Sequence, residues 1–172
     1  EPQPGEALLR CSQGDSEAAW AELRVALAAA DRLSRMRLLR GAVEIALARG
    51  DLDEAEQHCT DLAAGAATFG TPGFKAWAAH ARGALLVRRG RHADALEVLS
   101  TALREYRVQQ SRYETAEVYD WMARAHRGMG AEDAARADEA TAASIYRQLG
   151  VEPAHICGAP SPGGLTKREV EI

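Results

Sequence analysis

The side chains that could act as metal ligands or nucleophiles in this chain are five histidines and three cysteines. These residues are His58, His80, His92, His126, His155, Cys11, Cys59 and Cys157. His58 and Cys59 are adjacent, so on a helix their side chains would point about 100° apart and could not easily grip one ion. The His155-x-Cys157 pair has no second pair to complete a zinc site. We therefore predict no metal site.

The sequence also lacks the surroundings that a catalytic cysteine needs. No cysteine is accompanied by a glycine-rich turn or by a third residue to orient a histidine. The chain has no Gly-x-x-x-x-Gly-Lys-Ser/Thr loop to cradle nucleotide phosphates. An enzyme would then require a bound metal or cofactor. We predict no catalytic residue, no cofactor and no enzyme activity, and interpret the histidines and cysteines as core or surface residues.

The composition favours packed helices. The 172 residues are 47% hydrophobic but only 5% aromatic, and alanine and leucine supply most of the apolar content. The net charge of −4 argues against attraction of nucleic acid to the whole surface. No apolar run approaches the roughly 18 residues of a membrane span. Three distant cysteines fit a reducing compartment, so we expect a cytoplasmic protein without membrane association. The lack of an initiator Met leads us to expect that more protein precedes Glu1.

A glycine recurs at nearly regular intervals along the chain. Gly14, Gly50, Gly90 and Gly130 stand 36, 40 and 40 residues apart. Five positions after these glycines stand Ala19, Ala55, Ala95 and Ala135. Twelve positions after them stand Ala26, Leu62, Ala102 and Ala142, and sixteen positions after them stand Ala30, Ala66, Tyr106 and Tyr146. These three offsets fall on one face of a helix. The repeat therefore predicts a helix whose small residues face inward, where a neighbouring helix can come close.

Glycines and capping residues divide the chain into helices. We expect the end of a helix over 7–13 and helices over 16–30, 34–49, 74–89, 92–108, 112–129 and 131–149. A further helix should bury Leu52, Ala55, Cys59, Leu62, Ala63 and Ala66. Asp15 and Asp51 should cap two of these helices, and Asp51 with Glu54 forms a pattern like a capping box. The segment 69–73 is the clearest internal loop. The connections are short, so successive helices should be antiparallel.

This spacing resembles the tetratricopeptide repeat, a family in which each repeat is a pair of antiparallel helices. Gly83 and Ala123 match the small residue in the first helix, and the residues that match the turn and the second helix are Gly50, Gly90, Gly130, Ala55, Ala95, Ala135, Ala102 and Ala142. The resemblance implies an all-α, right-handed superhelical solenoid of about 3.5 repeats over residues 1–149. The chain departs from the family in lacking the closing proline and in a period near 40 rather than 34. Longer repeats resemble those of bacterial signal-sensing regulators.

The last residues carry a second resemblance. Proline and glycine concentrate in 150–164, which predicts a linker. Residues 165–172, Leu-Thr-Lys-Arg-Glu-Val-Glu-Ile, resemble the opening of the LuxR-type helix-turn-helix domain, and Thr166 with Glu169 forms a capping box. The resemblance implies a transcription regulator whose repeats precede its DNA-binding domain. The recognition helix is not in this sequence, so DNA would be bound only through the missing part of that domain.

The family pattern implies that the first helix of each pair lines a concave groove. The positions expected to be exposed there are Arg37, Arg40, Glu44, Trp77, His80, Ala84, Glu117, Asp120, Arg124 and Arg127. Arginine can form bidentate bonds with carboxylates, and Trp77 can anchor an apolar group. The groove could hold an extended peptide, a partner protein or helix, or a small acidic inducer. Alternatively these are solvated helix faces, with Trp77 packed between repeats. Trp20 and Trp121 are expected to be packing residues.

Two functions follow from these patterns. The first is a non-catalytic sensor or protein-interaction region that couples the binding of a partner or inducer to the DNA-binding domain of a LuxR-family regulator. The alternative is a stand-alone repeat scaffold unrelated to transcription. An N-terminal half-pair would expose apolar surface if upstream repeats were missing, and this surface could drive formation of a homodimer.

Overall fold

The computed structural model describes residues 15–151. Within this range the chain forms seven helices and no strand, which confirms the all-α prediction. The helices are α2 (Ser16–Ala29), α3 (Arg32–Arg49), α4 (Leu52–Phe69), α5 (Pro72–Arg88), α6 (His92–Val108), α7 (Arg112–Gly128) and α8 (Glu132–Leu149). The expected helix end at 7–13, the truncated domain at 165–172 and the linker after residue 151 lie outside the described residues.

Polar side chains begin the first helices as predicted. Asp15 accepts a hydrogen bond from the backbone N–H of Ala18 at 3.2 Å, and Asp51 accepts one from that of Glu54 at 3.0 Å. The reciprocal half of the capping box at Asp51 does not form, because the Asp51 N–H is donated to the carbonyl of Ala46. Glu54 instead pairs with Arg49, whose Nη1 lies 2.7 Å from its carboxylate.

The repeating glycines end the alternate helices α3, α5 and α7. Gly50, Gly90 and Gly130 have φ angles of 78°, 74° and 76°, in the left-handed region where glycine carries no steric penalty. After each of them, the next backbone N–H donates to the carbonyl five residues earlier, a pattern that satisfies the free carbonyls at a helix end. The predicted helix stops at these glycines are therefore confirmed.

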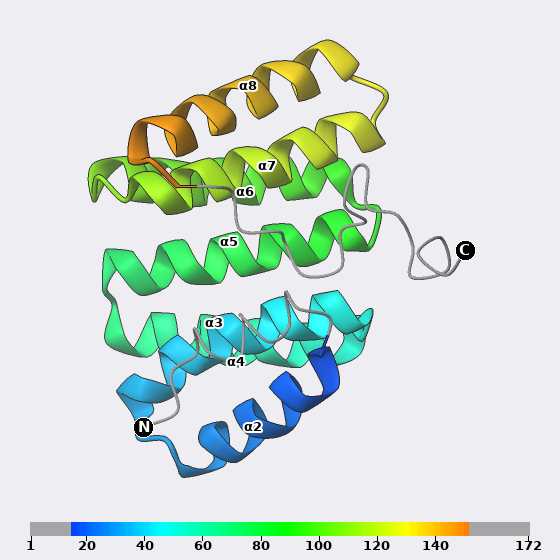
Figure 1. The fold of residues 1–172 in the computed structure, drawn as a ribbon. Coiled ribbons are helices and arrows are strands. Elements are labelled where there is room, and N and C mark those ends of the chain that lie inside the picture. The colour runs from blue at the N-terminus through cyan, green and yellow to red at the C-terminus, as the bar shows by residue number, and fades with distance from the viewer. Residues whose placement is uncertain (1–14, 152–172) are drawn as a thin grey trace.

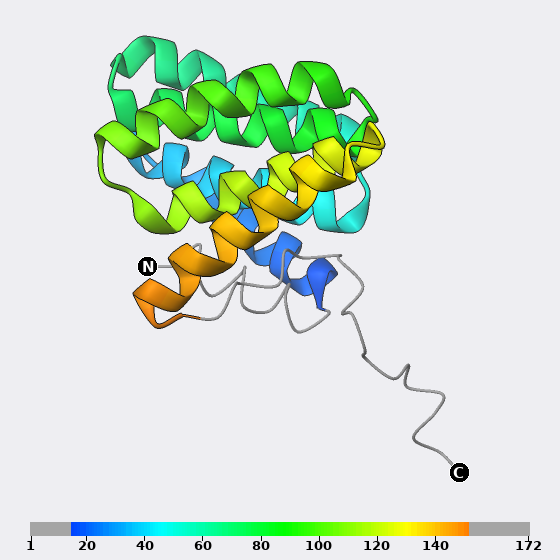
Figure 2. The ribbon, with the colours of Figure 1, turned by 90° about the horizontal axis from the view of Figure 1, so that it is seen from above.

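The helices follow one another from α2 at one end of the molecule to α8 at the other (Figure 1). Each connection has two or three residues, so neighbouring helices run antiparallel and pack along their lengths (Figures 1 and 2). The alternate helices α3, α5 and α7 are therefore parallel, and α3 contacts α5 while α5 contacts α7. Within the described residues, no such contact joins α4 to α6 or α6 to α8. The stack is thus tighter on the side of α3, α5 and α7.

The small residues of the repeat that were predicted to face inward are buried, except Ala30, which is half-buried at the end of α2. Ala55, Ala95 and Ala135 each expose 0% of their surface, and the residues seven and eleven positions after each are also buried. At Gly83 on α5, an added Cβ would lie 2.5 Å from side-chain atoms of Leu99 on α6. The helices of a pair therefore approach so closely that only a small residue fits at the contact.

Two local predictions are wrong. Segment 69–73 is not a long loop, because Pro72 starts α5 at the first helical turn, where its missing N–H costs nothing. Thr71 caps that helix by accepting from the N–H of Phe74. Ala63 is exposed, since it lies about 100° around α4 from the buried Leu62. The other expected bounds agree with those observed to within two residues, and those of α6 are identical.

Candidate functional site

Helices α3, α5 and α7 share a surface, which we call the A face, whose charged and aromatic side chains interact across the three helices. Its members are Arg40, Glu44, Trp77, His80, Glu114, Glu117, Asp120 and Arg124. Arg40, His80 and Asp120 stand 40 residues apart, so they occupy equivalent positions of the repeat. The fold thus turns the sequence repeat into a row of side chains, one from each helix.

Tyrosines from the paired helices hold two members of this row. The Tyr106 hydroxyl on α6 lies 3.4 Å from Nδ1 of His80, and the two rings meet edge to face with centroids 5.9 Å apart. The Tyr146 hydroxyl on α8 donates to the Asp120 carboxylate at 2.9 Å. The equivalent residue in the first pair is Ala66, which has no hydroxyl. Arg40 therefore lacks a tyrosine partner of its own repeat.

Arg40 instead extends over α5 to reach α7. Its Nη2 donates to the Glu117 carboxylate at 2.8 Å, and its Nη1 lies 3.6 Å from the carboxylate of Glu114. Its Nε lies 3.5 Å from Glu44, one turn along α3. On the way, the guanidinium lies over the ring of Trp77, 5.8 Å from the centroid, at a distance that allows a cation–π interaction.

Three carboxyl groups thus share one guanidinium in a place crowded by three helices. Burial raises the pKa of Glu117 to about 8, against the opposing effect of Arg40, with Glu44 and Glu114 adding to the rise. Burial also raises the pKa of Glu44. Burial alone would lower the pKa of Arg40, but the neighbouring carboxylates outweigh it and raise that pKa. Glu117 therefore keeps its proton at neutral pH, which relieves the excess of negative charge.

These groups are crowded without being closed off from solvent. The side chains of Arg40 and Glu117 expose 21% and 19% of their surface, and that of Glu44 exposes 38%. These side chains therefore lie partly buried at the surface rather than enclosed in the core. A ligand that reaches these groups meets partly desolvated charge, which strengthens electrostatic interactions.

The other end of the A face has a different charge pattern. The Arg124 guanidinium lies over the ring of Trp121, 4.7 Å from the centroid, and burial lowers the pKa of Arg124. Burial likewise raises the pKa of Asp120, opposed by the hydrogen bond from Tyr146. Trp121 itself is only 6% exposed and packs in the core, as predicted.

The residues predicted to line the groove differ in how exposed they are. Arg40, Glu44, Trp77, Glu117, Asp120 and Arg124 are partly exposed, and Arg37 and Arg127 are exposed. The expectation that His80 and Ala84 are exposed is wrong, because only 7% of His80 and 4% of Ala84 is accessible. Tyr106 packs against the imidazole of His80. Burial lowers the pKa of His80 to about 3, so the imidazole is neutral.

Two features of the site were not predicted. Arg127 turns away from the A face and pairs with Glu132 and Glu139 of α8. Glu114 belongs to the cluster around Arg40, but no sequence pattern marks it. The tyrosines at the sixteenth position of the repeat were a usable signal, because a tyrosine packed against a helix needs a partner for its hydroxyl.

Among the described residues, the other histidines and Cys59 are packed or paired within the fold, whereas Cys11, His155 and Cys157 lie outside the described residues. Burial raises the pKa of Cys59 to about 12, so its thiol is a poor nucleophile at neutral pH. Within residues 15–151, no group of three or more His, Cys, Asp and Glu side chains is arranged to hold a metal ion. His58 packs against Trp20, with ring centroids 5.4 Å apart. The absence of enzyme activity stays a prediction.

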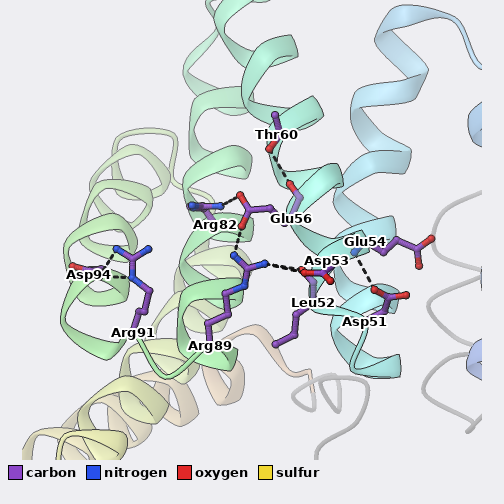
Figure 3. A network of polar contacts seen from close by, with 10 residues as sticks. All are labelled: Asp51, Leu52, Asp53, Glu54, Glu56, Thr60, Arg82, Arg89, Arg91 and Asp94. Atoms are coloured by element: carbon purple, nitrogen blue, oxygen red, sulfur yellow. Dashed lines mark hydrogen bonds and ion pairs between the residues drawn. The ribbon is translucent and has the colours of Figure 1, made fainter.

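A second polar network joins α4 to α5 away from the A face (Figure 3). Arg82 of α5 and Arg89, which caps the end of that helix, converge on Glu56 of α4. The hydrogen bond from Arg82 is the largest cause that lowers the pKa of Glu56. Arg89 also lies 3.6 Å from Asp53. Each of these charges has a partner on the neighbouring helix, so this network stabilises the contact between two repeats.

Comparisons with known proteins add nothing to this geometry. No family model matches the chain, and neither the curated proteins nor the solved structures contain a match. In the described part of the chain, no helix is both long enough and apolar enough to cross a membrane.

Proposed function

We propose that the described helices form a solenoid like that of the tetratricopeptide repeats, with right-handed superhelical pairing and α2 as the second helix of an incomplete first pair. Support comes from the three left-handed glycines 40 residues apart and from the buried alanines five residues after each. Equivalent helices of neighbouring repeats contact each other on the side of α3, α5 and α7 but not on the side of α4, α6 and α8, and this favours a stack that curves toward the A face. That face would then be the concave groove.

The function we propose is that of a non-catalytic binding region, which receives a peptide, a partner protein or a small inducer on the A face. The observation that supports this most is the cluster of Arg40, Glu44 and Glu117, whose charges are partly desolvated yet still accessible. Such an arrangement raises the pKa of two carboxyl groups and so opposes folding at higher pH. Groups kept at a cost to stability are candidates for recognition.

The resemblance of residues 165–172 to the LuxR-type domain extends this proposal to transcription. The groove would be the sensor of a cytoplasmic LuxR-family regulator, and occupancy would be passed through 150–164 to a DNA-binding domain beyond Ile172. Reading the open reading frame past Ile172 tests this cheaply. About 50 further residues with helix-turn-helix patterns would support it. A stop codon would favour the alternative, a stand-alone interaction scaffold, and overturn the regulatory role.

The proposal makes a prediction for the full-length regulator. Trp77→Ala should abolish or strongly weaken the transcriptional response to the physiological signal, because it removes the apolar anchor of the A face. Trp20→Ala, which changes a tryptophan packed against His58 on another face, is the matched control. The measurement is reporter expression at equal protein levels. A response that survives both Trp77→Ala and deletion of residues 15–149 would contradict the proposal.

Oligomerisation is a separate proposal. Val25 on α2 is 70% exposed at the end of the stack, which favours association of two copies through that end. Light scattering of Val25→Glu against the natural protein tests it: a homodimer that forms through this end should become a monomer, and an unchanged mass would contradict it.

A further inference from the structure

Arg40 connects two helices whose backbones are not in contact. Within the described residues, α3 contacts α4, α5 and α2, and α7 contacts α5, α6 and α8, but no contact joins the backbones of α3 and α7. The side chain of Arg40 nevertheless reaches Glu117 at 2.8 Å and Glu114 at 3.6 Å. The polar contact between residues 40 and 117 therefore spans α5, which lies between the two helices.

We propose that Arg40 is a clamp that sets how far the repeat stack can open. In a solenoid each repeat contacts only its neighbours, so small changes in the angle between neighbours add up along the stack. A bond between α3 and α7 limits the total change in angle over these repeats. The partners have the geometry for such a bond: the five N–H groups of the guanidinium point in several directions, and three carboxyl groups lie around it.

The equivalent positions show why the clamp occurs once. His80 and Asp120 are tied to the tyrosines of their own pairs, Tyr106 and Tyr146. The equivalent of these tyrosines in the first pair is Ala66, which offers no hydroxyl. Arg40 therefore binds groups outside its own pair. Arg40 is also long enough to pass over Trp77, and its cation–π contact there supports the extended conformation.

The clamp has a consequence that rests on the proposed function. Arg40 covers the ring of Trp77, so a partner that uses Trp77 as its anchor must displace Arg40 from it. Displacement breaks the bonds to α7 and lets α3 and α7 move apart. Binding on the A face would then be converted into a change in the curvature of the stack, which the helices after α7 would transmit.

The clamp can be tested without any partner, by measuring the distance between α3 and α7. Spin labels are attached at Arg32→Cys and Arg112→Cys, two exposed and equivalent positions at the starts of these helices. The background carries Cys11→Ser, Cys59→Ala and Cys157→Ser. Double electron–electron resonance then gives the distribution of distances. Arg40→Met should lengthen the mean distance by more than the width of the distribution in the parent protein, and Glu114→Leu with Glu117→Leu should do the same.

A matched control separates the clamp from a general loss of charge. Arg124→Met removes an arginine that lies over a tryptophan of its own helix, so the distance should stay unchanged. Circular dichroism verifies that each variant is folded, and Arg40→Lys, which keeps the charge but offers one donor centre, should give an intermediate shift. Equal distances in Arg40→Met and the parent protein would overturn the clamp. That outcome would leave a binding function for the A face standing, since the reporter assay tests it independently.

Discussion

Glu117 holds its proton to a higher pH than an exposed glutamate, and this links the A face to the stability of the fold. Its pKa rises from 4.5 to about 8, because burial disfavours its charged form and Glu44 and Glu114 add negative charge. The folded chain therefore binds more protons than the unfolded chain between these two values. The contribution of Glu117 to stability is fully present below pH 4.5 and is lost as the pH rises through about 8.

We predict that the free energy of unfolding falls as the pH rises from 7 to 9, and that Glu117→Gln removes most of this fall. The amide mimics the protonated carboxyl and does not ionise in the unfolded chain, so the variant should already be more stable than the natural protein near pH 7 and exceed it by a wider margin near pH 9. His80 does not contribute there, since its pKa of about 3 keeps it neutral. Denaturant titrations at each pH provide the measurement. The charged and titratable groups around Glu117 are Arg40, Glu44, Glu114 and Asp120.

The control for this prediction is Glu97→Gln on α6, an exposed glutamate outside the A face. Its pH dependence should follow that of the natural protein. A fall in stability that persists unchanged in Glu117→Gln would show that Glu117 is ionised at neutral pH and that its surroundings are more hydrated than the structure indicates.

At the scale of the helices, packing depends on alanines that leave no room for a longer side chain. Ala95 on α6 exposes 0% of its surface, whereas Ala93 on the same helix is exposed. Ala95→Arg should lower the free energy of unfolding by about 3 kcal/mol, because it forces a charged side chain into a close helix contact. Ala93→Arg should change it by less than about 0.5 kcal/mol. Thermal melts of the two variants check the register, and equal melting temperatures would contradict it.

The end of α6 carries a strained residue that a glycine should relieve. Gln110 has a φ of 57°, and it is the equivalent, 40 residues away on either side, of Gly70 and Gly150, which have φ of 67°. Gln110→Gly should raise the free energy of unfolding by about 1 kcal/mol, because a non-glycine residue resists the left-handed conformation.

The reverse substitution is the control. Gly90→Gln places the longer residue at a φ of 74°, where an added Cβ meets no atom within 4 Å, so the penalty comes from the backbone alone. It should lower the free energy of unfolding by about 1 kcal/mol. Chemical denaturation of both variants is the measurement. A loss of stability in Gln110→Gly would show that the glutamine side chain makes a contact worth more than the strain.

The sequence predicted the helices well because glycines and aspartates mark their ends locally. Gly50, Gly90 and Gly130 stop helices by a conformation that other residues resist, and the offset to the buried alanines follows from helix geometry alone. The left-handed conformation of Gln110 was not predictable, because glutamine is a good helix former and does not mark a turn. Pro72 between two glycines indicates a loop from the sequence alone, although proline is also favoured in the first turn of a helix, where the structure places it.

At the scale of the whole molecule, the site could be predicted only in part. Equivalent positions in the repeat identified the helix faces that carry Arg40, Trp77 and Glu117, because one period governs all three helices. The contact between residues 40 and 117 was not predictable from that period. It depends on how far one side chain reaches across a neighbouring helix, and on Ala66 standing where the other repeats have a tyrosine. The deep position of His80 depends on Tyr106 in the same way.

The charge that the A face offers to a ligand also depends on contacts between distant residues. Arginine was expected to face an acidic ligand, but Arg40 is engaged by Glu44, Glu114 and Glu117 of the chain itself. A ligand on this part of the A face must therefore exchange with the internal contacts of Arg40. The energy of these contacts limits the affinity of a partner.

The most direct test of this account is a double-mutant cycle between Arg40 and Glu117. Arg40→Met keeps the apolar part of the side chain, Glu117→Leu removes the acceptor, and the unfolding free energies of the natural protein, both single variants and the double variant give the coupling. We predict a coupling of about 1 kcal/mol or more. A coupling near zero would mean that α3 and α7 are not held together over α5, and it would contradict both the geometry of the A face and the clamp.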